Sequence, residues 1–324
     1  MKNSSYLSPS VMTLGFGELT SMRYMYLALV VWGYLSTVLS NVSVILVIII
    51  HKELQEPMYI FICALCFNGL YGSLAFYPSL FINLLQKVQT ISYSSCILQV
   101  FAIHTYGGCE MTLLAVMALD RYVCICNPLR YNSIMSSAMV YKLILAAWSY
   151  PFILNTIHIM LTVRLPLCDS AILKIYCDNW SVVRLSCIDT TLNNTFGMVA
   201  IIALLVVMPS LIFISYIAIL RACVKSSKDF RAKALKTCAP HLITITIFIV
   251  GVLFELFLYR FTPTAIPYAL RVFMSVHFLV APPLLNPLIY GLKLTEIRIK
   301  IIQQVKGHFR ENIKAIDHEN SSAK

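Results

Sequence analysis

A few ionisable side chains stand inside long apolar stretches, and they are the first candidates for chemistry. Glu110 lies in the middle of one such stretch. A charge inside a bilayer costs so much free energy that an ionisable group there is a functional candidate by default. Together with Asn41 and Asn68, Glu110 could line a small polar cavity for a cation or a proton. The alternative is a protonated Glu110 that is hydrogen-bonded to a neighbour, because burial favours the neutral acid.

Asp120 and Arg121 form an adjacent pair at the end of the same stretch. Neighbouring residues on a helix point about 100° apart, so Arg121 can reach inward while Asp120 restrains it. A charge pair at the edge of a bilayer that can be broken would act as a two-state latch. The alternative is that Arg121 is an anchor at the cytoplasmic face of a membrane.

Four cysteines fall in or next to the loops that we assign to the oxidising side of the membrane: Cys96, Cys168, Cys177 and Cys187. They allow three pairings, or some could stay free. A bond that ties the long loop to the third apolar segment would hold this loop over the helices as a lid. On that basis we favour Cys96 with Cys177, which leaves Cys168 with Cys187.

The elements that must position these groups are long apolar segments. Of the 324 residues, 59% are hydrophobic and 12% are charged, and the mean hydropathy is +0.79; a soluble domain carries about twice that share of charge. Soluble enzymes and nucleic-acid-binding modules are therefore poor candidates. Seven continuous runs are long enough for a hydrocarbon core of roughly 30 Å, and continuous runs favour helices over barrel strands. The runs cover residues 24–50, 58–85, 96–117, 140–161, 196–220, 242–258 and 267–292. The predicted fold is an all-α membrane protein, a bundle of seven transmembrane helices.

The formal net charge of +11 is explained by the way the chain crosses the membrane. Most basic residues lie on one side of the seven runs, and the positive-inside rule assigns that side to the cytoplasm. We expect an extracellular N-terminus over 1–23, the helical domain over 24–292, and a cytoplasmic amphipathic helix and tail over 293–324, with the helix on the lipid bilayer. The sequons at Asn3 and Asn193 then lie outside and are candidate glycosylation sites.

Five words along the chain carry a resemblance to a known family. They are PMY at 57–59, MALDRY with PLRY between 117 and 131, SY at 215–216, KALKTCAPHL at 233–242 and PLLNPLIY at 283–290. Each word is short, but in this order and spacing they span nearly the whole chain. On these words the sequence resembles the rhodopsin-like G-protein-coupled receptors, and within them the odorant (olfactory) receptors. The word at 233–242 is the olfactory one, and residues 57–72 look similar to the fish-type group.

The resemblance implies roles for the matching residues. Cys96 and Cys177 would form the family disulfide. Asp120, Arg121 and Tyr122 would serve G-protein coupling, with Arg121 contacting the G protein in the active receptor. Activation would rearrange Tyr216, Asn286, Pro287 and Tyr290.

Glu110 stands where odorant receptors place an acidic residue that is suspected of holding sodium. Gly69 replaces the aspartate that most of the superfamily carries in the second span, so the sodium site would rest on Glu110 without that partner. Apart from this sodium ion, no metal and no cofactor is expected. A tyrosine that is often assigned to the activation switch is replaced by Ile249 in the sixth span.

The ligand class is narrowed by exclusion. Amine receptors carry an aspartate seven residues after the third-span cysteine, and here that residue is Ile103. No lysine lies between 274 and 290, which excludes a retinal Schiff base of the opsin type. The ligand-binding candidates at the outer ends of the helices are His104, Gly107, Gly108, Glu255, Tyr259 and Arg260.

Two of these candidates suggest an acidic ligand. Arg260 and His104 could together receive a carboxylate. The alternatives are that Arg260 reaches to the lipid headgroups and that His104 is a core histidine with a satisfied hydrogen bond. Glu255 could also neutralise Arg260. Gly107 and Gly108 fit either a compact ligand space or a close helix crossing.

The sequence therefore predicts a multi-pass plasma-membrane odorant receptor, and not an enzyme. It would bind a small-molecule odorant in the outer half of the bundle and activate a stimulatory heterotrimeric G protein, which raises cyclic AMP. It would bind no nucleic acid. One alternative is a non-olfactory chemosensory receptor of the same fold. The other is a transporter or channel, which would need broken helices at the midplane and charged rings along a pore, and only Glu110 is a candidate for these.

Overall fold

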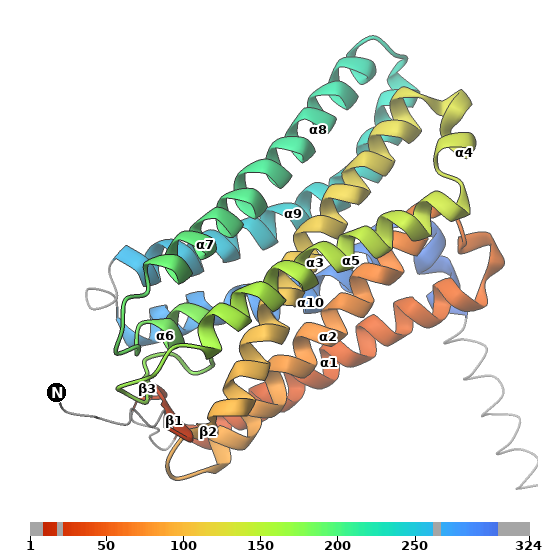
Figure 1. The fold of residues 1–324 in the computed structure, drawn as a ribbon. Helices are drawn as coiled ribbons and strands as arrows, with labels where there is room; N and C mark the ends of the chain where they lie inside the picture. Colours follow the sequence, from red (N-terminus) through yellow and green to blue (C-terminus); the bar gives the residue numbers. More distant parts are fainter. Residues whose placement is uncertain (1–8, 18–21, 262–266, 304–324) are drawn as a thin grey trace, which may run out of the picture.

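The computed structural model describes residues 9–17, 22–261 and 267–303, and the side chains of residues 233 and 257–261 lie outside this description. The chain forms a bundle of long helices that run alongside one another (Figure 1). The long helices are α1 (Arg23–Ile50), α2 (Pro57–Leu85), α3 (Tyr93–Cys126), α5 (Ser137–Val163), α9 (Lys228–Phe261) and α10 (Tyr268–Lys293). A further long helix is continuous through α7 (Thr191–Ile202), the π-helical turn η3 (Ala203–Val207) and α8 (Met208–Val224).

Within the described residues, six stretches are long and apolar enough to cross a membrane, and Thr191–Val224 counts as one of them. Helix α3 is the seventh long helix and is more polar, because it carries Glu110, Asp120 and Arg121. It packs against α2, α5, α8 and α9, so these charged side chains are buried inside protein and not in lipid. The predicted helical membrane bundle is therefore confirmed.

The outward faces of the bundle are apolar. Trp32 and Leu39 on α1, and Phe213 on α8, are each about two-thirds exposed, at 65%, 66% and 66%. A protein in water rarely leaves so many large apolar side chains uncovered, whereas in a bilayer they contact lipid. The chain is a multi-pass membrane protein.

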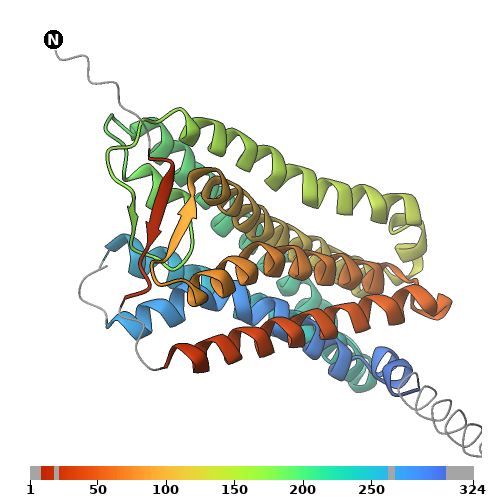
Figure 2. The ribbon, with the colours of Figure 1, turned by 90° about the horizontal axis from the view of Figure 1, so that it is seen from below.

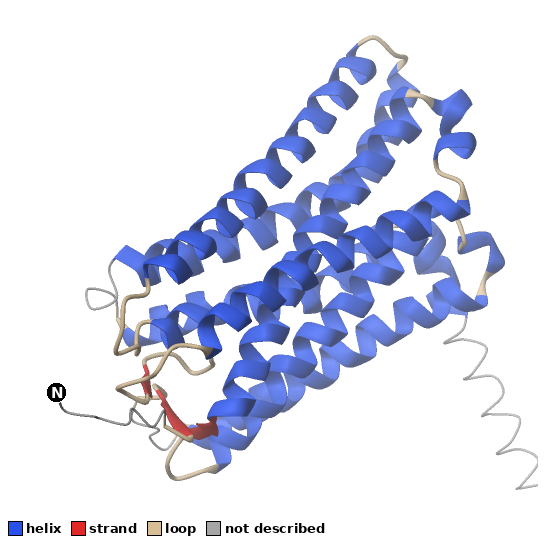
Figure 3. Ribbon diagram, in the orientation of Figure 1, coloured by secondary structure: helices blue, strands red, loops and turns tan. Residues whose placement is uncertain are grey.

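A small sheet at one end of the bundle was not expected for an all-α protein (Figure 3). Strand β1 (Val11–Leu14) lies between β2 (Thr90–Ser92), to which it is antiparallel, and β3 (Ala171–Ile172), to which it is parallel. Met12 and Leu14 alternate into the core while Val11 and Thr13 face out. Four residues are too few for a strand to be recognised from alternating apolar and polar positions in the sequence. The strand forms because it is buried against two segments that are distant in the sequence. Residues 9–17 are thus part of the folded domain.

The sheet defines one end of the bundle, which we call the sheet end. The opposite end, the tail end, carries the short segments η1 (Lys52–Leu54), η2 (Pro128–Arg130) and α4 (Tyr131–Ile134). It also carries a helix over 295–303, the last described residues (Figure 2). Ile297 of this helix is buried in the core while Arg298 is exposed, so the helix is amphipathic.

Candidate functional site

The loop between α5 and α7 is fastened over the sheet end by two disulfides. Cys96 at the start of α3 is bonded to Cys177, and Cys168 is bonded to Cys187, with Cα–Cα distances of 5.5 Å and 5.2 Å. The side-chain oxygen of Gln99 on α3 also accepts a hydrogen bond of 2.9 Å from the Cys177 amide. The loop, with its short helix α6 (Asn179–Val183), is therefore held down on α3.

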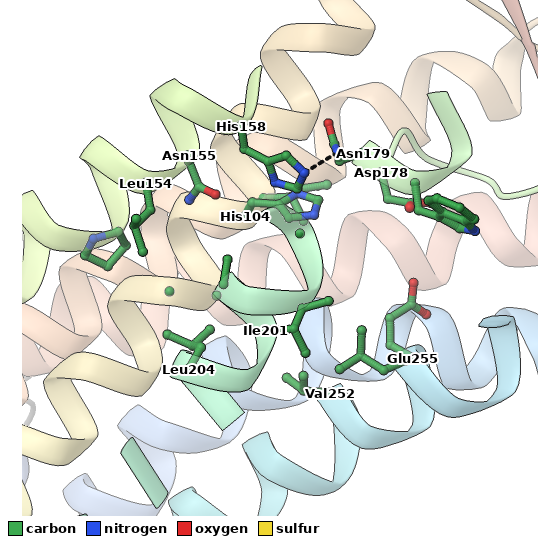
Figure 4. A pocket seen from close by; sticks show the side chains of 18 of the residues that line it. His104, Leu154, Asn155, His158, Asp178, Asn179, Ile201, Leu204, Val252 and Glu255 are labelled. Atoms are coloured by element: carbon green, nitrogen blue, oxygen red, sulfur yellow. Dashed lines mark hydrogen bonds between the residues drawn. The ribbon is translucent and has the colours of Figure 1, made fainter. Parts of the chain in front are cut away.

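A cavity of about 220 Å³ lies beneath this loop, between α3, α5, α7, α9 and α10. Four of the sequence-predicted ligand residues line it: His104, Gly107, Gly108 and Glu255. The side chains of the other two, Tyr259 and Arg260, lie outside the described residues. Much of the wall is apolar, and Leu154, Ile201, Leu204 and Val252 surround the space in Figure 4. A concave, mostly apolar cavity with a few polar groups is the usual form of a small-molecule site.

The two adjacent glycines do different things. A Cβ on Gly108 would lie 2.6 Å from Cβ of Pro151, so Gly108 permits the close crossing of α3 and α5. A Cβ on Gly107 would meet nothing within 4 Å. Gly107 therefore leaves open space at the cavity wall.

One end of the cavity holds a buried ionic group that sequence reasoning missed. The Lys174 ammonium pairs with Glu255 on α9 and, at 3.0 Å, with Asp178. The hydroxyl of Tyr176 lies 2.8 Å from the same Glu255 oxygen. Glu255 is thus engaged by the loop, and the predicted neutralisation of Arg260 by Glu255 falls on a side chain outside the described residues. The only sign of this ionic group in the sequence was the spacing of Lys174 and Asp178, which are four residues apart on either side of Cys177.

The electrostatics of this group are shown by Asp178, which belongs to the loop and not to a span. Burial alone would raise the pKa of this carboxyl, but Lys174 and the hydroxyl of Ser181 outweigh the burial and hold the pKa below its ordinary value. Asp178 is therefore ionised and bonded, and it fixes the loop next to the cavity.

Two histidines also line the cavity. The rings of His104 on α3 and His158 on α5 have centroids 6.5 Å apart. Nε2 of His158 is 2.8 Å from the side-chain nitrogen of Asn179, the bond drawn in Figure 4. His158 was not predicted as a cavity residue, because a lone histidine in an apolar run forms no motif with other residues in the sequence.

The structure corrects the prediction of a glycan on Asn193. This side chain is 2% exposed, lines the cavity and has its nitrogen 3.4 Å from the hydroxyl oxygen of Thr162. A glycosylated amide must face solvent, and this one faces inward because the sequon lies in the first turn of α7 and not in the loop. Asn3 lies outside the described residues.

Glu110 lies in a buried polar core midway along α3. Its two carboxylate oxygens accept hydrogen bonds of 2.8 Å from Asn68 on α2 and 2.6 Å from Asn286 on α10. Each asparagine keeps a buried side-chain oxygen without a hydrogen-bond partner in the described structure. A carboxylate with neighbouring amide oxygens is an oxygen-only donor set, which suits a hard cation.

The neighbourhood of Gly69 leaves little room for another side chain. A Cβ at this position would lie 3.2 Å from the side-chain oxygen of Asn41, whose nitrogen donates 2.7 Å to the carbonyl of Pro283. Among the described residues, no group of three or more His, Cys, Asp or Glu side chains is placed to hold a metal. Any cation here would therefore rest on Glu110 and amide oxygens.

At the tail end, Asp120 and Arg121 form the ion pair that their sequence positions suggested. The Arg121 guanidinium donates to the Asp120 carboxylate, which also accepts a 2.7 Å hydrogen bond from Tyr131. Both residues of the pair are buried. The neighbouring Tyr122 packs on the small apolar cluster of Ile219, Cys223, Ala234 and Cys238 between α8 and α9.

The other predicted activation residues lie between this pair and the polar core around Glu110. Tyr216 on α8 contacts His241 on α9, a residue that was not singled out from the sequence, although it lies in the word at 233–242. Tyr290 on α10 has its hydroxyl 3.1 Å from that of Thr244, and Asn286 and Pro287 are buried one turn away. The structure thus gathers these side chains at the tail end and the polar core.

These features define a seven-helix membrane receptor, with a small-molecule cavity under a disulfide-bonded loop at one end and a buried ion pair at the other. Comparison with known proteins agrees with this class. A family model described as "Olfactory receptor" matches residues 30–307. Olfactory receptor 4B13 of Mus musculus is 35% identical over 82% of this chain and 86% of its own length. Olfactory receptor 2F1 of Homo sapiens is 33% identical over 91% and 93%. The chain belongs to the olfactory receptor family.

Proposed function

We propose that the chain is an odorant receptor whose ligand binds in the cavity beneath the disulfide-bonded loop and whose tail end activates a stimulatory heterotrimeric G protein. The observation that carries this proposal is the cavity itself. Its wall includes Lys174 of the loop and Glu255 of α9, which form an ion pair. A ligand in this space would touch the helix that also carries His241 at the other end. Ligand binding and the tail end would therefore be coupled through one rigid element.

The proposed orientation places the sheet end outside the cell and the tail end in the cytoplasm of a plasma-membrane protein. Disulfides form on the oxidising side, and both lie at the sheet end. Exposed basic residues at the tail end, among them Arg221, Lys225, Lys228 and Arg231, agree with the positive-inside rule. They would face a G protein and anionic lipid headgroups.

The tail end supplies the proposed switch. Asp120 holds Arg121 in the resting state, and the bond from Tyr216 to His241 holds α9 against α8. Outward movement of α9 would break the second contact and free Arg121 for the G protein. Tyr122, Asn286, Pro287 and Tyr290 would rearrange with it.

A sodium ion held by Glu110 with Asn68 and Asn286 would stabilise the resting bundle, since it would bridge α2, α3 and α10. The ion supplies charge compensation for a buried carboxylate and no chemistry. No other cofactor is part of the proposal.

Cyclic AMP in cells that express the chain tests this function. A panel of small molecules should include at least one that raises cyclic AMP, and Arg121→Ala should abolish the response when cells are compared at equal surface expression. Arg130→Ala, which alters an exposed arginine on η2, is the matched control and should respond like wild type. A ligand-gated current that persists in Arg121→Ala without G protein would contradict the proposal.

A further inference from the structure

The hydrogen bonds of His104 decide which of its ring nitrogens faces a ligand. Its Nδ1 lies 2.9 Å from the backbone carbonyl of Val100. A carbonyl can only accept, so Nδ1 carries the proton. In the neutral ring Nε2 then presents a lone pair, and within the described residues no donor reaches it. Asp178 does not require a charged His104, since Lys174 already lies 3.0 Å from its carboxylate.

His158 is held in the opposite tautomer. The side-chain oxygen of Asn179 lies 2.8 Å from the hydroxyl of Thr162, which is also 3.0 Å from the carbonyl of His158, and the amide nitrogen of Asn179 is turned toward the histidine ring. That nitrogen is 2.8 Å from Nε2 of His158. An amide NH₂ can only donate, so Nε2 accepts and the ring proton sits on Nδ1. In the described part of the chain this N–H has no acceptor.

The cavity wall therefore offers one acceptor and one donor from two neighbouring rings that stand edge to face (Figure 4). A hydroxyl group is the simplest ligand group that donates and accepts at the same time. We propose that the cavity is specific for a neutral ligand with a hydroxyl group, which donates to Nε2 of His104 and accepts from Nδ1 of His158. This inference rests on the proposed function only in placing the ligand in this cavity.

Charged ligands fit this wall less well. A carboxylate only accepts, so it would face the lone pair of His104. Among the described side chains it would also meet two carboxylates, Asp178 and Glu255, against one ammonium, that of Lys174. An ammonium only donates, so it would face the N–H of His158. The inference thus differs from the acidic ligand predicted from Arg260 and His104, and the side chain of Arg260 lies outside the described residues.

The size of the cavity limits the rest of the ligand. A dry cavity of about 150 Å³ holds benzene, and this one is about 220 Å³. An apolar body of one ring with a short chain, or a medium-length alkyl chain, fills such a space. Its neighbours would be the apolar residues Leu154, Ile201, Leu204 and Val252.

The test uses two sets of compounds that share a skeleton and differ in the end group. One set is phenylethanol, propylbenzene, phenylethylamine and phenylacetate; the other is octanol, nonane, octylamine and octanoate. Binding to the purified full-length chain in lipid nanodiscs, without G protein, is measured from the ligand-dependent rise of the thermal unfolding midpoint. We expect at least one alcohol to bind about threefold or more tightly than each of its three analogues, as one or two hydrogen bonds allow.

Two substitutions remove the ligand-facing nitrogens and keep the hydrogen bonds of these side chains to the protein. His104→Asn keeps a donor for the Val100 carbonyl and lacks the acceptor at Nε2. His158→Gln keeps an acceptor for Asn179 and lacks the donor at Nδ1. Each should weaken binding of the alcohol about three- to tenfold and leave the hydrocarbon unchanged. His277→Asn, which alters a histidine of α10 outside the cavity, should change neither.

Several results would overturn the inference. They are failure of both alcohols to bind, equal binding of alcohol and hydrocarbon, tighter binding of the acid or the amine, or equal loss of alcohol and hydrocarbon binding in the two variants. Failure of the proposed function is a different result, since it would appear as alcohol binding without G-protein activation. G-protein activation by amines or acids alone would keep the function and reject the hydroxyl ligand.

Discussion

The hydroxyl of Tyr216 on α8 lies 2.6 Å from Nδ1 of His241 on α9. His241 is engaged at the same time through Nε2, which is 3.1 Å from the carbonyl of Leu114 on α3. Because the carbonyl can only accept, Nε2 carries the proton and Nδ1 accepts from Tyr216. One buried histidine therefore joins three helices at the tail end, beside Arg121.

Removing the Tyr216 hydroxyl should loosen this connection. Tyr216→Phe keeps the ring, so basal nucleotide exchange on a stimulatory G protein should rise about two- to tenfold, the effect of one lost hydrogen bond on a two-state equilibrium. Tyr141→Phe, on an exposed face of α5, is the control. Unchanged basal exchange in Tyr216→Phe would show that this bond does not restrain α9.

The buried Lys174 pair should matter far more for stability than a surface pair. Lys174→Met leaves Glu255 and Asp178 without their cation, and loss of one partner of a buried pair costs about 3–5 kcal/mol. Lys300→Met breaks a pair with Glu53, whose side chain is 73% exposed, and should cost far less because water screens the pair. Thermal unfolding in nanodiscs compares the two, and similar midpoints would contradict the burial argument.

Stability should also depend on pH through Asp178. Its folded pKa is below the ordinary value of 3.8, so its contribution is fully present above that value and is lost as the pH falls through the lower folded pKa. The gap in unfolding midpoint between wild type and Asp178→Asn should therefore narrow only below pH 3.8. A gap that is constant down to strongly acidic pH would mean that the charge of Asp178 does not stabilise the fold.

The adjacent glycines of α3 should respond in opposite ways to alanine. Gly108→Ala forces a Cβ against Pro151 and should cost about 1–3 kcal/mol. Gly107→Ala meets open space and should leave the free energy of unfolding unchanged or raise it by about 0.5–1 kcal/mol, because glycine disfavours a helix. Unfolding midpoints of the two variants give the answer, and a larger loss at Gly107 would reverse the assignment of the helix crossing.

Sodium should stabilise the resting receptor if Glu110 holds it. We expect a higher unfolding midpoint in sodium chloride than in choline chloride at equal ionic strength, and Glu110→Gln should remove the difference because it removes the charge. Glu53→Gln, on the exposed surface, should retain it. A wild-type midpoint that is the same in both salts would rule out a sodium site of useful affinity.

The sequence predicted the features that depend on long runs of residues. Seven apolar segments of membrane length predict the bundle, because each segment must bury its backbone polar groups within a helix. The same reasoning made Glu110 a functional candidate, because an ionisable group inside a bilayer is costly, and allowed Arg121 to reach inward from the bilayer edge.

Features that depend on contacts between distant segments could not be predicted. Strand β1 forms only because two other segments pair with it, and Lys174 meets Glu255 only after the loop folds over α9. The inward turn of Asn193 and the pairing of His158 with Asn179 depend on where α7 and α6 begin, and no short pattern marks those points.

Ligand-stimulated exchange of a GTP analogue on a purified stimulatory G protein, with this chain in nanodiscs, tests the central claim most directly. The account predicts that a ligand which raises the unfolding midpoint also raises the exchange rate, and that Arg121→Ala keeps the midpoint shift but loses the exchange. A ligand that binds the cavity of the wild-type chain without raising exchange, or exchange that persists in Arg121→Ala, would contradict it.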